Sequence, residues 1–312
     1  MRCPRVGNAV RGRGVRGSLR RCINLALLLF GLCSYPAWAA AGNAHPIVLV
    51  HGFTGWGPDE MGGFSYWGGN NSIARMLTEA GQPTYTGVVG PVSSNWDRAC
   101  ELYAYIKGGR VDYGAAHAAR FQHARYGRSF PGLLPDWGQS PQRARIHLVG
   151  HSQGGQTARV LTSLLANGDE QERQATAPED LHPLFRGGRE WVHSVTTLST
   201  PHDGSTLATI LAGEADHLLG WLLALASYLG HHYRDAPSYD FKLDQWQLVQ
   251  GENESDQQFR QRLQNSNLWQ QDDIATWDLR PAGAKQLNAR YPAVQSTYYF
   301  SWATQDSVAA PG

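Results

Sequence analysis

The pattern Gly-x-Ser-x-Gly at residues 150–154 places a serine where it could act as a nucleophile. An apolar run at residues 146–149 precedes the pattern, and a segment of helical character at residues 156–161 follows it. A strand, this pattern and a helix together form a nucleophile elbow, a tight turn that lifts the serine hydroxyl to the edge of a sheet. We therefore predict that Ser152 is a nucleophile. The alternative is an ordinary serine in a turn, because the bare pattern also occurs by chance.

A serine at such an elbow performs acyl transfer, in which it attacks an ester carbonyl and forms an oxyanion and then an acyl-enzyme. The oxyanion needs backbone N–H donors, and one of them belongs to the residue after the nucleophile, Gln153. The second donor comes from the loop after the first central strand, which here is the His-Gly-Phe-Thr-Gly segment at residues 51–55. Without further information, this segment could also be a simple turn at the end of a strand.

The elements that must position these groups alternate along the chain. Short apolar runs predict five strands, at residues 46–50, 83–90, 145–149, 191–198 and 296–302. Between them, helices are predicted at residues 72–80, 99–107, 156–167 and 256–265, and a polar surface loop at residues 167–179. Strands that alternate with helices indicate an α/β fold with a largely parallel sheet covered on both faces. Ligands bind at the carboxyl ends of such strands, where residues 51–52, Ser152 and residues 202–203 all fall.

The first residues have the character of an export signal. Seven arginines precede residue 22, an apolar run occupies residues 23–32, and Ala-Trp-Ala ends at Ala39. These three parts are typical of a secretory signal peptide, and the apolar run is too short to span a bilayer. We predict a signal peptide at residues 1–39, with cleavage after Ala39 or Ala41, and secretion of a single domain at residues 40–312. Export by the Sec or the Tat route stays open.

Charge and cysteine content restrict the remaining chain further. Without the seven signal arginines, 20 Lys and Arg face 26 Asp and Glu, a net charge of −6. A mildly acidic domain gives no electrostatic reason to bind nucleic acid. Of the four cysteines only Cys100 follows the signal, so no intrachain disulfide is expected after cleavage. The helical spacing around Cys100 favours a buried structural thiol over a reactive one.

Several segments taken together resemble the secreted thermoalkaliphilic bacterial triacylglycerol lipases and their staphylococcal relatives. The resemblance extends over most of residues 44–303. It rests on residues 46–69, 90–100, 111–124, 150–159, 200–206 and 239–246. It implies an α/β-hydrolase fold that hydrolyses triacylglycerols at an oil–water interface, without a stable membrane span. It also assigns the N–H of Phe53 as the second oxyanion donor.

The same resemblance implies a zinc-binding insertion and a helical lid. Its zinc ligands correspond to Asp97, His117, His123 and Asp244, a closed structural set of four N and O donors. The two histidines are six residues apart, or about 240° around a helix, so an irregular segment must bring them together. Calcium is not assigned. The apolar segment at residues 212–230 is the expected lid, although its pattern fits a core helix equally well.

The base and acid that should activate Ser152 have no position in this resemblance. In the fold they follow the nucleophile in the order acid, then His. The family places both well after the strand at residues 296–302, so we expect them, and one or more further strands, beyond Gly312, as in a truncated or frameshifted chain. His202 and Asp203 are sequence neighbours that precede the expected positions, and they are not expected to substitute. The alternative to a serine lipase is a catalytically inactive lipase-like protein that binds zinc.

Overall fold

The computed structural model describes residues 43–139, 144–213 and 239–305. The chain divides into two units, Met1–Gly42 and Asn43–Gly312, and every described residue belongs to the second unit. The signal peptide predicted at residues 1–39 and most of the lid predicted at residues 212–230 lie outside the described residues. Among the described helices, none is long and apolar enough to cross a membrane.

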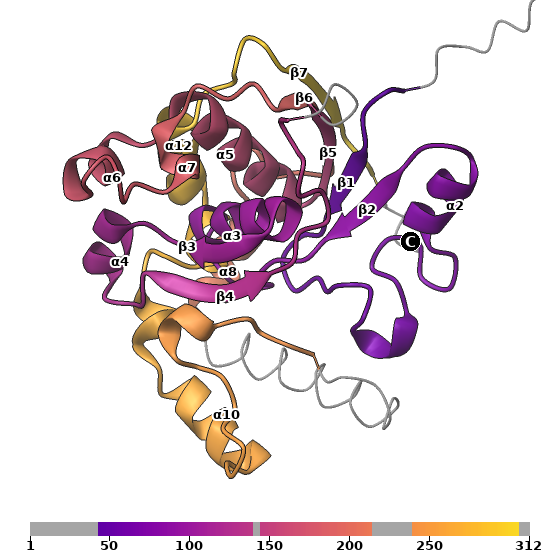
Figure 1. Ribbon diagram of the computed structural model, residues 1–312. Coiled ribbons are helices and arrows are strands. Elements are labelled where there is room, and N and C mark those ends of the chain that lie inside the picture. Colours follow the sequence, from indigo (N-terminus) through magenta and orange to yellow (C-terminus); the bar gives the residue numbers. More distant parts are fainter. Residues whose placement is uncertain (1–42, 140–143, 214–238, 306–312) are drawn as a thin grey trace, which may run out of the picture. The chain divides into compact units, whose positions relative to one another are not determined.

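A parallel sheet of five strands forms the centre of the second unit, in the order β2-β1-β5-β6-β7 (Figure 1). The strands are β1 (Ile47–Val50), β2 (Thr84–Gly87), β5 (Ile146–His151), β6 (Val192–Leu198) and β7 (Tyr298–Trp302). These are the five strands predicted from the apolar runs, each shifted by a few residues at most. A separate antiparallel pair, β3 (Gly109–Asp112) and β4 (Tyr126–Phe130), was not predicted.

Helices connect the strands, as the alternating pattern predicted. The four predicted helices are present as α2 (Ile73–Glu79), α3 (Asn95–Lys107), α5 (Gln153–Asn167) and α10 (Asp256–Gln264). The sequence did not predict α4 (Ala115–Phe121), α7 (Pro183–Arg186), α8 (Thr206–Gly213), α11 (Ala275–Asp278), α12 (Pro281–Arg290) and the short η1 (Met61–Gly63), η3 (Asp244–Trp246) and η4 (Asn267–Gln270).

The polar segment at residues 167–179 corrects one prediction, because it contains the helix α6 (Glu170–Ala175) rather than only a loop. The carboxylate of Asp169 accepts a hydrogen bond from the amide of Glu172 and caps this helix. Glu172 is buried, although the segment is polar throughout. Capping and a buried contact therefore decide the structure of a segment that has no apolar pattern.

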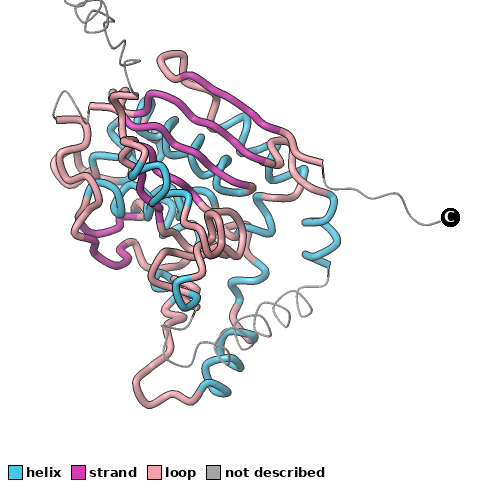
Figure 2. The backbone as a smooth tube through the Cα atoms, turned by 90° about the vertical axis from the view of Figure 1, so that its right-hand side faces the viewer, coloured by secondary structure: helices cyan, strands magenta, loops and turns pink. Residues whose placement is uncertain are grey.

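One face of the sheet carries the main hydrophobic core. Val48, Val50, Leu148 and Val195 are fully buried there, against residues of α3 and α5. Figure 2 shows the strands side by side, with helices behind them. The alternate residues of β7 point to the opposite face, where Tyr298, Phe300 and Trp302 are all more than half exposed. The helices α3 and α5 therefore support the strand ends from one side.

Candidate functional site

The predicted elbow is present where β5 ends at His151 and α5 begins at Gln153. Between them, Ser152 has φ 53° and ψ −128°, a strained backbone conformation for a residue with a side chain. A Cβ atom on Gly154 would lie 2.2 Å from the carbonyl oxygen of Val50. Gly154 is therefore required because β1 and the start of α5 pass too close for a side chain, and a Cβ atom on Gly150 would lie 2.4 Å from the backbone of Gly154.

Ser152 lines a cavity of about 280 Å³ at the carboxyl edge of the sheet. Phe53, Leu207, Ala208 and Leu279 form most of its apolar wall. A cavity of this character suits the acyl part of an ester better than a charged ligand.

The two predicted oxyanion donors belong to elements that meet at the serine. A Cβ atom on Gly52 would lie 2.7 Å from the Cβ atom of Ser152, so the loop after β1 touches the elbow. Within the described part of the chain, neither the amide of Phe53 nor that of Gln153 donates a hydrogen bond to the protein. Gln153 is also the first residue of α5, where the helix dipole favours a negative charge. Both amides are thus available to an oxyanion.

Two side chains that the sequence analysis did not identify hold the loop after β1. Arg98 is fully buried, and its guanidinium donates hydrogen bonds to the carbonyl oxygens of His51 and Gly90 and to the hydroxyl of Thr157 on α5. This single side chain therefore joins the loop that carries Phe53 to the helix that begins at Gln153. Charge-assisted hydrogen bonds of this kind are stronger than neutral ones.

Tyr66 joins the same loop to the end of β5, directly before the serine. Its hydroxyl accepts a hydrogen bond from the amide of Gly52 at 3.0 Å and lies 2.5 Å from Nδ1 of His151. Burial raises the pKa of Tyr66, so its hydroxyl stays protonated and can donate to the imidazole. The residues before Phe53 and before Ser152 are thereby tied together through one hydroxyl group.

No imidazole ring among the described residues lines the cavity at Ser152. His202 lies with Nδ1 3.2 Å from the guanidinium of Arg159 and Nε2 3.1 Å from the hydroxyl of Thr197. Both ring nitrogens are therefore used by other groups, as expected if His202 and Asp203 do not serve Ser152 as base and acid. Burial, followed by the charge of Arg159, lowers the pKa of His202 and keeps this ring neutral.

A second group of polar side chains lies under the N-terminus of α3 and could hold a metal ion. Asp97, His117, His123 and Asp273 each place one ligand atom so that all four atoms lie within 4.8 Å of one another. His117 lies on α4, and Gln122 after this helix has a left-handed conformation with φ 59°. This turn is the irregular segment that the spacing of the two histidines requires.

The donor set fits a divalent cation. Asp97 Oδ1 and His123 Nε2 are buried and form no hydrogen bond with the described residues. The other atoms of the same groups are occupied, because Asp97 Oδ2 accepts from Gln245 at 2.7 Å and His123 Nδ1 lies 2.9 Å from the carbonyl oxygen of Ala124. Burial, followed by the charge of Asp273, raises the pKa of Asp97. A cation between the carboxylates would offset both effects, since buried charges must be paired.

The fourth member of the group corrects the assignment of Asp244. In the structure Asp244 forms an ion pair with Arg128 on β4, and its side chain is partly exposed. Its neighbour Gln245 points inward instead and bonds Asp97. The position expected for Asp244 is taken by Asp273, which lies 3.1 Å from His117 and 3.2 Å from His123.

Long-range contacts bring Asp273 and His117 to this place. An isolated bridge pairs Ile274 with Ser93, directly before α3, and so sets Asp273 beside Asp97. The carboxylate of Glu172 on α6 accepts hydrogen bonds from the amides of Ala116 and His117, at 3.0 and 2.8 Å. The burial of Asp273 was signalled only by the apolar residues that follow it, and nothing local indicated Glu172.

Parallel strands that carry a serine elbow at their carboxyl edge, under an apolar cavity, define an α/β-hydrolase-like fold, the class expected from the sequence. The family described as "Lipase-like, C-terminal domain" matches residues 43–310. The chain belongs to this family.

Relatives and solved structures agree with this assignment. A protein named "Lipase" from Staphylococcus epidermidis is 45% identical over 255 residues, which are 80% of this chain and 36% of that protein. EstA from Clostridium botulinum is 48% identical with a TM-score of 0.77, over 86% of this chain and 62% of that one. Lipase 1 from Pelosinus fermentans is 50% identical with a TM-score of 0.75, over 82% and 67%. The chain thus spans about a third of the length of the curated relatives it matches.

Proposed function

We propose that this protein is a secreted serine lipase that hydrolyses the ester bonds of triacylglycerols, with broader activity on simple esters. The observation that carries the proposal is the strained Ser152 at the wall of an apolar cavity, next to the amides of Phe53 and Gln153, which donate to no group among the described residues. The names of the relatives, "Lipase" among them, support the choice of substrate. No observation on the described residues favours the alternative of an inactive zinc-binding protein.

In the proposed reaction, the hydroxyl of Ser152 attacks the ester carbonyl while the acyl chain lies along Phe53, Leu207 and Leu279. The amides of Phe53 and Gln153 donate hydrogen bonds to the oxyanion that forms. Each such donor is worth about 3–4 kcal/mol in the transition state. The alcohol leaves, and water then hydrolyses the acyl-enzyme. We propose that the base and acid that serve Ser152 lie outside the described residues.

We propose that zinc occupies the group formed by Asp97, His117, His123 and Asp273. Two imidazoles and two carboxylates suit zinc in a closed site with four protein ligands. Such an ion would stabilise the fold and take no part in ester hydrolysis. It would join the start of α3 to α4 and to the segment before Ile274, three parts that are far apart in sequence. Protein purified without added metal should contain one zinc per chain, and chelation should lower its melting temperature.

We further propose that residues 1–39 direct export and are removed, which leaves a single lipase domain at residues 40–312. The apolar stretch at residues 212–230 is proposed as a lid that opens at an oil surface. A lid of this kind would make the activity per enzyme rise once a short-chain ester exceeds its solubility. A rate that rises smoothly through the solubility limit would contradict the lid.

Hydrolysis of a triglyceride emulsion by the full chain and by two serine variants tests the catalytic proposal. Ser152→Ala should lower the rate by at least about 1000-fold, because the nucleophile is lost. Ser129→Ala changes an exposed serine of β4 that does not line the cavity, so it serves as a control that should keep the rate within about twofold. Equal rates for the wild type and Ser152→Ala would dismiss the assignment of the nucleophile.

A further inference from the structure

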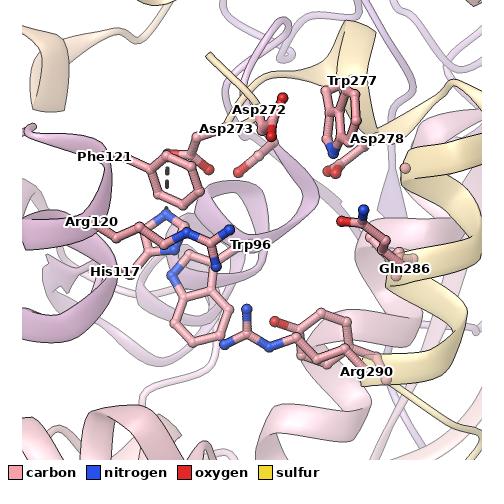
Figure 3. Close-up of a pocket in the computed structure, with 14 residues that line it drawn as sticks. Trp96, His117, Arg120, Phe121, Asp272, Asp273, Trp277, Asp278, Gln286 and Arg290 are labelled. Atoms are coloured by element: carbon pink, nitrogen blue, oxygen red, sulfur yellow. Dashed lines mark hydrogen bonds and ion pairs between the residues drawn. The ribbon is translucent and has the colours of Figure 1, made fainter.

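A cavity of about 100 Å³ lies between α4, the segment around Asp273, and α12 (Figure 3). Two members of the metal-binding group, His117 and Asp273, line it. The other two members lie deeper, because the side chains of Asp97 and His123 are fully buried and do not line the cavity. An ion that reached the group through this cavity would therefore meet His117 and Asp273 first.

The outer part of the cavity is polar and open. Asp272, Arg120 and Gln286 line it and are exposed to solvent. The guanidinium of Arg290 is paired with Asp169 at 2.7 Å, and that of Arg120 lies over the ring of Phe121. Among the described residues, the carboxylate of Asp272 and the guanidinium of Arg120 form no ion pair, and their charges near the opening largely cancel. A cation approaching the opening meets no strong electrostatic barrier.

The size of the cavity suits a partly hydrated ion. A buried water needs only about 10–15 Å³, so the cavity admits an ion that keeps several of its waters. The carboxylate of Asp273 and the imidazole of His117, whose atoms lie 3.1 Å apart, can then replace these waters before the deeper groups bind.

From this arrangement, and resting on the metal binding proposed above, we propose that the cavity between α4 and α12 is the passage through which the divalent cation enters and leaves the group. Gln286 on α12 is an exposed residue of the cavity lining, so a larger side chain at this position should narrow the opening. The ion then exchanges without unfolding of α4 or of the segment that carries Asp273.

The test compares variants of Gln286 in the full chain. Gln286→Trp narrows the opening with a neutral side chain, and Ala289→Trp adds the same side chain at an exposed position of α12 that does not line the cavity. Zinc release to a chromogenic chelator and zinc uptake by the metal-free protein are followed over time, and the dissociation constant is measured separately by competition.

Gln286→Trp should slow both uptake and release about tenfold, equivalent to a barrier about 1.4 kcal/mol higher. Its dissociation constant should stay within twofold of the wild type, because the bound state is unchanged. Gln286→Ala widens the opening and should speed both rates several-fold, and Ala289→Trp should match the wild type. Release rates should not change in low urea.

Rates of Gln286→Trp and Gln286→Ala that equal those of Ala289→Trp, with zinc bound normally, would overturn the passage alone. A release rate that rises with urea in proportion to unfolding would do the same, since it would indicate exchange through an opened structure. Absence of bound zinc in the wild type would overturn both the passage and the metal proposal, whereas the proposal for Ser152 is not affected by any of these results.

Discussion

The elbow at Ser152 and the metal-binding group differ in what sets their geometry. The elbow is built from the backbone of consecutive residues, and the two groups proposed as oxyanion donors, the amides of Phe53 and Gln153, are backbone groups as well. The metal-binding group is built from four side chains, spread from Asp97 to Asp273, and each depends on contacts with other segments. The first region is therefore sensitive to any change in backbone spacing, and the second to the loss of individual side chains.

This difference predicts which substitutions should impair catalysis and which should impair metal binding. A side chain added near the elbow should disturb catalysis and leave metal binding intact. A ligand removed from the metal-binding group should abolish metal binding and leave the backbone at Ser152 in place. Four experiments test whether the two regions are as independent as this comparison states.

The largest effect is expected from Asp273→Ala. Loss of a partner that only orients a ligand costs about 10–100-fold in metal affinity, so loss of a ligand should cost more than 100-fold. Asp244→Ala breaks a partly exposed ion pair with Arg128 and should leave zinc affinity within about twofold. Competition with a chelator measures both constants. Loss of zinc in Asp244→Ala together with retention in Asp273→Ala would show that the fourth ligand is assigned wrongly.

Gly154→Ala should disturb the geometry of the elbow and leave the metal-binding group unchanged. Its Cβ atom would lie 2.2 Å from the carbonyl oxygen of Val50, so β1 and α5 must move apart. Overpacking of this kind costs about 1–3 kcal/mol, which denaturant titration measures. Gly251→Ala is the control, because a Cβ atom there meets Glu254 at an ordinary 3.7 Å. Ester hydrolysis should fall sharply in Gly154→Ala with zinc still bound. Loss of zinc would break the comparison.

Tyr66→Phe tests whether the hydroxyl of Tyr66 positions the loop before Phe53. It removes the hydroxyl that accepts from the amide of Gly52 and joins His151, so the loop before Phe53 loses a fixed position. We expect kcat to fall about tenfold, equivalent to about 1.4 kcal/mol, with KM nearly unchanged. Tyr85→Phe removes the hydroxyl of a tyrosine on β2 that forms no hydrogen bond with the described residues and does not line the cavity at Ser152, so it should be neutral. An increase in KM at constant kcat would assign Tyr66 to substrate binding instead.

The smallest effect concerns pH and His147 on β5, the strand that ends at the elbow. Burial, followed by the neighbouring His193 and His45, lowers the pKa of His147 to about 4. The folded protein therefore keeps this ring neutral, while the unfolded chain gains a proton below about pH 6.5. The free energy of unfolding should fall between pH 6.5 and 4, by about 1 kcal/mol for a half-buried ring. His147→Gln should flatten this part of the pH profile, and an unchanged profile would contradict it.

The sequence predicted the sheet and the elbow at Ser152 well, because their geometry is local. The strands of the sheet are short apolar runs because parallel strands carry much of the core, although one face of β7 is exposed. The elbow follows from one six-residue segment. The turn between His117 and His123 could also be predicted, since a regular helix would have kept the two rings apart. In each of these cases the structural reason lies within a few residues of the feature.

The metal-binding group could be predicted from the sequence only in part. The place of Asp273 depends on the bridge between Ser93 and Ile274, which lie on segments far apart in sequence. The resemblance pointed to Asp244, but only the structure shows that Gln245 is the inward-facing neighbour. The helix α6 was missed for a similar reason, because buried Glu172 is held by amides of α4 and not by an apolar face. The contacts of Asp273 and Glu172 with distant segments leave no local pattern, whereas the cap of α6 by Asp169 is local.

The reactivity of the Cys100 thiol can report the opening of α3. It is the only cysteine after residue 33, it is fully enclosed in the core, and burial raises its pKa well above the usual value. A thiol reagent can reach it only when α3 separates from the core, so the rate of modification reports how often that happens. Because Asp97 and Arg98 lie on the same turn of this helix, each opening exposes the metal-binding group and releases the loop of Phe53 together. The rate of thiol modification would therefore measure, in one signal, how often both regions open.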